Sequence, residues 1–111
     1  MRPKSVNILG TTYRIIYCDK PSDVDIFHRE SLFGQIDYWT GTIRVFDNGT
    51  GDDRVWHTII HEVLHGIGYA LKLKINEEEH HEELDTLSIA LFDTFQRNGW
   101  LKAPAKQKSD E

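Results

Sequence analysis

The sequence predicts an α+β fold: a small domain in which an N-terminal antiparallel β-sheet, including a hairpin, packs on two antiparallel helices. Before residue 48, apolar and polar residues alternate in short runs rich in β-branched and aromatic side chains, which is typical of half-buried strands. After residue 51, apolar residues recur at steps of three and four, which is typical of amphipathic helices. Residues 1–101 form one predicted domain, and the polar residues 102–111 form a predicted flexible tail.

The composition limits the classes of function. The 111 residues are 39% hydrophobic and 28% charged, which suits a globular protein with one core. The net charge of -5 argues against nucleic acid as a partner, because that contact needs a basic face. No apolar run has the length of a membrane helix and no signal-peptide core is visible, so we expect no membrane contact and a cytoplasmic location. The single cysteine, Cys18, excludes an intrachain disulfide.

The predicted sheet occupies the first 47 residues. Residues 5–9 and 12–18 alternate around Gly10 and are expected to be two strands. A loop is expected at 20–23, and a short helical piece is one option for residues 24–31. Residues 33–47 are expected to form a hairpin that turns at Trp39-Thr40-Gly41.

A first helix is predicted at about residues 52–72. Asp52 and Asp53 suit its start, because acidic side chains there meet the positive end of the helix dipole. Gly66 and Gly68 each weaken a helix by about 1 kcal/mol relative to Ala. We therefore expect another segment of backbone to approach this helix closely. The apolar residues that define the helix are Val55, Ile59, Ile60, Val63, Leu64, Ile67, Ala70 and Leu71.

A second helix is predicted at about residues 76–98. Asn76 is a plausible N-cap, and Asn98-Gly99 is a plausible stop. A short turn near residues 73–76 would make the two helices antiparallel. The side chains expected on the buried face of this helix are Leu84, Leu87, Ser88, Leu91 and Phe95.

The run His61-Glu62-Val63-Leu64-His65 is the most informative motif. In a helix, positions 61 and 65 lie one turn apart on the same face, so two imidazoles can bind one Zn²⁺ ion. Zinc would lower the pKa of a bound water, and Glu62 would act on that water as general base. The motif therefore predicts a zinc metallopeptidase with His61 and His65 as ligands and Glu62 as the catalytic residue.

A catalytic zinc normally has a third protein ligand, which we expect from the start of the second helix. At about 100° per residue, His80 and His81 fall close to the buried face, whereas Glu82 points nearly opposite. We predict His81 as the third ligand, with His80 and then Glu82 as the alternatives. Asp85 lies one turn after His81 and could orient a ligand from behind.

With these residues in view, the chain resembles the small ImmA/IrrE-like metallopeptidases and their phage-encoded relatives, in the gluzincin branch of zincins. The resemblance covers about residues 34–98 and is carried by residues 58–67, 82–88 and 95–98. It implies a zincin-like domain, with the substrate laid along a strand before the metal-binding helix, here Ile43-Arg44-Val45. It also implies a Glu as third ligand where this chain has His81, so either His replaces Glu or Glu82 binds one position later.

The remaining expectations concern partners and neighbouring residues. His57 lies one turn before His61 and is a candidate for a role near the metal, with partial burial as the alternative. Tyr38 is a candidate oxyanion donor, with packing as the alternative. A peptide or protein substrate is expected, and the short sheet suits a monomer or a weak dimer. The alternative function is a non-catalytic zinc-binding domain acting in protein interaction or regulation, which a fourth ligand such as His80 would favour; a phage-type regulator that acts on a host or repressor protein is a third.

Overall fold

A four-stranded sheet carries two helices on one side. The computed structural model describes residues 2–47, 49 and 51–101, and the predicted tail at 102–111 lies outside them. In chain order the strands and helices are β1 (Ser5–Ile8), β2 (Thr11–Cys18), β3 (Gly34–Asp37), β4 (Thr42–Phe46), α1 (Asp52–Leu71) and α2 (His81–Arg97). Three short 3-10 turns, η1 (Pro21–Asp23), η2 (Lys74–Asn76) and η3 (Glu78–His80), complete the described elements. The predicted α+β class is confirmed.

The sheet is mixed, with strand order β1-β2-β4-β3. The predicted antiparallel pairing is correct for β1 with β2 and for β3 with β4, but the central pair, β2 and β4, is parallel. Strand β3 lies at the outer edge of the sheet, and the hairpin turn that follows it places β4 between β3 and β2. Burial explains this order, because Ile43 and Val45 of β4 are fully buried whereas every residue of β3 is only partly buried.

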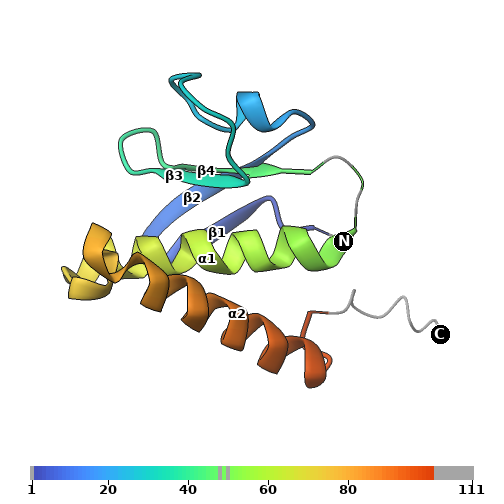
Figure 1. Cartoon of the computed structure of the whole chain (residues 1–111), viewed down its shortest axis with the longest axis vertical. Helices are drawn as coiled ribbons and strands as arrows, with labels where there is room; N and C mark the ends of the chain where they lie inside the picture. Colours follow the sequence, from blue (N-terminus) through green and yellow to red (C-terminus); the bar gives the residue numbers. More distant parts are fainter. Residues whose placement is uncertain (1, 48, 50, 102–111) are drawn as a thin grey trace.

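The core lies between the sheet and α1. Residues Ile8, Tyr13, Ile15, Ile43, Val45, Val55 and Ile59 form its buried cluster. In Figure 1, α1 runs along one face of the sheet, α2 lies on the far side of α1, and the segment between β2 and β3 covers the opposite face of the sheet. The layers are therefore the sheet, α1 and α2, with α1 in the middle.

Helix α1 matches the predicted helix, and Lys72 ends it in a left-handed conformation. The expected close approach at its glycines is confirmed, but side chains rather than backbone make it. A Cβ on Gly66 would lie 2.7 Å from Ile8 Cδ1, and a Cβ on Gly68 would lie 2.9 Å from Asn76 Cβ. The two glycines therefore make room for β1 and for η2.

Helix α2 begins five residues later than predicted, at His81. Asn76 is not its N-cap, since residues 74–80 form η2 and η3 and the Asn76 side chain bonds to His65 instead. The predicted buried face is correct at Leu84 and Ser88, which are fully buried, but wrong at Leu87, which is 41% exposed. Because α2 packs on α1 and on the short turns η2 and η3 but not on the sheet, its buried strip is narrow.

The segment between β2 and β3 has its helical turn at η1, not within residues 24–31 as one option had it. Asp25 organises the rest. Its buried carboxylate accepts hydrogen bonds from the backbone of Phe27 and Arg29 and from the side chain of Gln35 on β3. These bonds hold the pKa of Asp25 well below its usual value and attach the segment to the sheet. Within the described residues, no helix is long and apolar enough to cross a membrane.

Candidate metal centre

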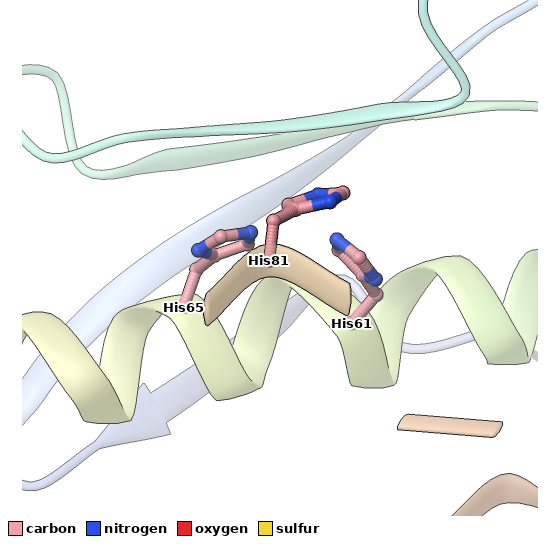
Figure 2. Close-up of side chains that lie close together, drawn as sticks. All are labelled: His61, His65 and His81. Carbon is pink, nitrogen blue, oxygen red and sulfur yellow. The ribbon is translucent and has the colours of Figure 1, made fainter. Parts of the chain in front are cut away.

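Three histidines converge between α1 and the start of α2. His61 and His65 lie one turn apart on α1, and His81 is the first residue of α2. Each offers one ring nitrogen, and these three nitrogens lie within 4.8 Å of one another. Figure 2 shows the three imidazoles gathered over one face of α1. The structure thus brings together the two motif histidines and the predicted third ligand.

Two of the histidines have a hydrogen-bond partner on Nδ1. His61 Nδ1 lies 3.1 Å from Asp85 Oδ1, and His65 Nδ1 lies 2.7 Å from Asn76 Oδ1. A carboxylate oxygen and an amide oxygen can only accept, so both Nδ1 atoms must carry the proton. The neutral rings then keep a free lone pair on Nε2, which is the form that binds a metal ion.

The donor set fits zinc. With Zn–N distances of about 2.0–2.1 Å, a tetrahedral ion separates its ligand nitrogens by roughly 3.3 Å. The three ring nitrogens, within 4.8 Å of one another, are already close to that separation. Three imidazoles are a known ligand set for catalytic zinc that leaves one position for water, and two of the three here, His61 and His65, have an outer partner on Nδ1.

Glu62 is buried beside the motif histidines at 6% exposure. Burial raises the pKa of its carboxyl group to about 8, and a hydrogen bond from the backbone N–H of Ile36 opposes that rise. Strand β3 comes so close here that a Cβ on Gly34 would lie 3.0 Å from Glu62 Oε2. The carboxyl group is therefore positioned by an edge strand as well as by its own helix.

The electrostatics of His61 also favour its neutral form. The pKa of His61 is lowered to about 4, first by burial and then by nearby His65, while Asp85 acts in the opposite direction. An imidazole that stays neutral at pH 7 has its lone pair available to a metal ion without first losing a proton.

The free edge of the sheet lies at the site. The Phe46 N–H donates to the Phe33 carbonyl at 2.8 Å, and bonded pairs alternate along an antiparallel ladder. The backbone groups of Gly34 and Ile36 therefore point away from β4, toward the outer edge. The expected substrate strand at residues 43–45 is wrong for this reason: β4 is paired on both sides, and the edge available to a peptide is β3.

The runner-up ligands lie outside the cluster. His80 Nδ1 lies 2.6 Å from Glu83 Oε1, and Glu82 is exposed and is not among the three grouped donors. Tyr38 stacks on Tyr69 with ring centroids 3.8 Å apart, and its hydroxyl donates to the His65 carbonyl at 3.3 Å. Tyr38 therefore packs behind the metal ligand in this structure.

Two residues of the site were missed in the sequence. Asn76 was interpreted as a helix cap, and Gly34 as an ordinary residue of a hairpin arm. The sequence signal for Asn76 was Gly68. Glycine weakens a helix, so its presence there indicated that a neighbouring side chain, which the structure shows to be Asn76, occupies the space of a larger residue. Gly34 offered a similar signal, because glycine within a strand often marks a close approach.

A groove of about 790 Å³ lies between the first turns of α1 and residues 89–92 of α2. His57 lies in its wall one turn before His61, and Ile89 and Phe92 of α2 supply apolar surface. Arg54 and the acidic start of α1 supply charge at its other end. The groove therefore lies toward the start of α1, one helical turn from His61, and none of the three clustered histidines lines it.

Comparison of the chain with protein-family models, with curated proteins and with solved structures gave no match. The functional inference therefore depends on the geometry of the centre.

Proposed function

We propose that this protein is a zinc-dependent peptidase. The observation that carries the proposal is the convergence of His61, His65 and His81 beside a buried Glu62. When bound, zinc supplies a Lewis acid and a water of lowered pKa. Within this chain, His61, His65 and His81 would hold the ion through their ring nitrogens.

Glu62 would move the protons. Its carboxylate would take a proton from the attacking water and give it to the nitrogen of the leaving amine. The raised pKa of Glu62, about 8 in the metal-free protein, suits a group that must both accept and donate a proton near neutral pH. A positive ion close to the carboxylate would bring that pKa down toward neutrality.

The edge of β3 would bind the substrate. An extended peptide could pair with the outward N–H and C=O groups of Gly34 and with the outward C=O of Ile36, as in strand addition to a sheet edge, while the Ile36 N–H donates to Glu62. That pairing would place a peptide bond beside Glu62, because Glu62 contacts β3 at these same residues. The groove next to His57 would accommodate a substrate side chain.

The alternative of a closed, non-catalytic zinc site requires a fourth protein ligand. Its candidate, His80, is bound to Glu83 and stands apart from the cluster. Among the described residues, the geometry therefore favours the open site of the peptidase proposal.

The test compares the zinc-loaded wild-type protein with Glu62→Gln on β-casein and on a quenched fluorescent peptide library. We expect hydrolysis by the wild type, a loss of about 10²–10⁴-fold in Glu62→Gln, and equal zinc content in both proteins by elemental analysis. Equal hydrolysis rates for the two proteins would contradict the proposal. Zinc binding without any hydrolysis would leave the metal centre intact and move the function to the regulatory alternative.

A further inference from the structure

A buried serine joins three polar groups behind the metal centre. Ser88 of α2 is 0% exposed. Its Oγ lies 2.7 Å from the Asp85 carbonyl oxygen, 3.3 Å from His57 Nε2 and 3.5 Å from His61 Nδ1. A buried hydroxyl of this kind must satisfy its hydrogen bonds with the groups around it.

Counting protons assigns the direction of each bond. A serine hydroxyl has one proton, and the carbonyl of Asp85 can only accept it. Ser88 Oγ is then an acceptor toward both imidazoles. His61 Nδ1–H is nearer to Asp85 Oδ1, at 3.1 Å. The remaining donor to Ser88 is His57, which must carry its proton on Nε2.

His57 lies beside the two residues of α2 that contact His61, namely Ser88 and Asp85. Its Nε2 also lies 3.9 Å from Asp85 Oδ1, so His57 and His61 face the same carboxylate oxygen. The ring packs near Phe92, with centroids 6.3 Å apart. The Asp85 side chain is 45% exposed, so without further contacts its carboxylate could turn toward water. Without the His57 N–H, Ser88 Oγ would also compete with Asp85 for the proton of His61.

We propose that His57 is a positioning residue of the metal centre, acting through Ser88 and Asp85. It holds the His61 ring so that Nδ1–H faces α2 and Nε2 faces the metal. The role rests on the metal site of the proposed function, but not on hydrolysis. Outer partners of ligating histidines commonly change metal affinity by 10–100-fold.

The test measures zinc affinity by competition with a chromophoric chelator, and the visible absorption of the cobalt-loaded protein. His57→Leu removes the N–H donor, whereas His57→Gln offers an amide N–H in a similar place. His28→Leu is the matched control, because His28 lies in the segment between β2 and β3, where its Nδ1 is 3.3 Å from the Ser22 carbonyl oxygen, and it belongs to neither α1 nor α2. Thermal unfolding of the metal-free variants reports whether each one folds.

We expect His57→Leu to weaken zinc binding about 10–100-fold, His57→Gln to retain it within about threefold, and His28→Leu to leave it unchanged. The cobalt spectrum should change in His57→Leu alone of these three. An unchanged affinity in His57→Leu, or an equal loss in His57→Gln, would overturn the proposal.

A double-mutant cycle tests the route through Ser88 and does not depend on His57→Leu alone. Ser88→Ala should weaken zinc binding, and the pair His57→Leu/Ser88→Ala should be little weaker than the poorer single variant. Additive losses would overturn the proposal. If the wild-type protein bound no zinc, the proposed function would fail as well, whereas zinc binding that is indifferent to His57 would overturn this role alone.

Discussion

At the scale of single residues, the three histidines differ in how firmly they are held. His61 and His65 each have a partner on Nδ1, whereas the His81 side chain is exposed and its ring has no hydrogen bond to the described residues. Asp85 and Asn76 would therefore orient two of the three proposed ligands before a metal ion binds. Such orientation contributes to affinity because less side-chain freedom is lost on binding.

Asn76→Ala tests the partner of His65. Without the amide oxygen, the ring can rotate and its protonated nitrogen is no longer fixed, so we expect zinc affinity to fall about 10–100-fold. Competition with a chelator measures this. Asn98→Ala is the matched control, because the Asn98 side chain bonds only to the end of α2 and zinc affinity should not change. An Asn76→Ala variant that binds zinc as tightly as the wild type would contradict the assignment.

Glu62 makes the metal-free protein sensitive to pH. Its pKa rises from 4.5 to about 8 on folding, so the folded state prefers the protonated form. The stability linked to Glu62 is complete below pH 4.5 and is lost as pH rises through about 8. Between pH 4.5 and pH 9, the unfolding free energy of the wild type should therefore fall by about 2–5 kcal/mol more than that of Glu62→Gln.

Urea unfolding of the metal-free proteins at the two pH values measures this difference. Other titrating groups are shared by both proteins and cancel in the comparison. A difference in stability between Glu62→Gln and wild type that does not depend on pH would show that Glu62 is not buried as described.

At the scale of elements, the edge strand β3 contributes no side chain at Gly34, where its backbone meets the side chains of Thr58 and Glu62 of helix α1. A Cβ on Gly34 would lie 2.5 Å from Thr58 Cγ2, which is closer than atoms pack in proteins. The contact brings the backbone of β3 to Glu62, so the distance between strand and helix affects both stability and the general base.

Gly34→Ala should therefore destabilise the protein by about 1–3 kcal/mol and reduce hydrolysis. Thr58→Ser removes the methyl group in question, and the pair Gly34→Ala/Thr58→Ser should recover part of the lost stability. Thermal unfolding and the casein assay measure the two effects. A Gly34→Ala variant with wild-type stability would mean that β3 can move away from α1 at no cost.

At the scale of the whole molecule, α2 is the most weakly attached layer. Within α2 only Leu84 and Ser88 are buried, while Leu87 and Ile89 are 41% and 49% exposed. The polar contacts of the metal centre, at one end of α2, supplement this narrow strip. A metal ion bound by His61, His65 and His81 would join α1 to α2 directly.

Zinc should therefore slow hydrogen exchange in α2. At a free zinc concentration 100 times Kd, binding adds about 2.7 kcal/mol to any opening that breaks the site, which is roughly 100-fold in exchange rate. His81→Ala is the control, because zinc held by α1 alone would not protect α2. Exchange in α2 that is unaffected by bound zinc would contradict a site shared between the helices.

Local patterns were sufficient for much of this molecule. The periodicity of residues 52–72 predicted α1 to within a residue, and the spacing of His61 and His65 placed both rings on one face, because helix geometry depends only on separation along the chain. The angular position of His81 on the predicted second helix, at about 100° per residue, was also enough to favour it over Glu82 as the residue that meets His61 and His65. The function of the centre stays a prediction from these residues.

Contacts between distant segments decided the rest. The parallel pairing of β2 with β4, and with it the free edge at β3, depends on which strand buries its side chains most completely, and no local pattern contains that comparison. Asn76 looked like a helix cap because capping is a local preference, yet its side chain is bound by His65 across the space left at Gly68. Pattern within a segment follows from backbone geometry, whereas a partner across the fold is selected by packing and by the need of buried polar groups for hydrogen bonds.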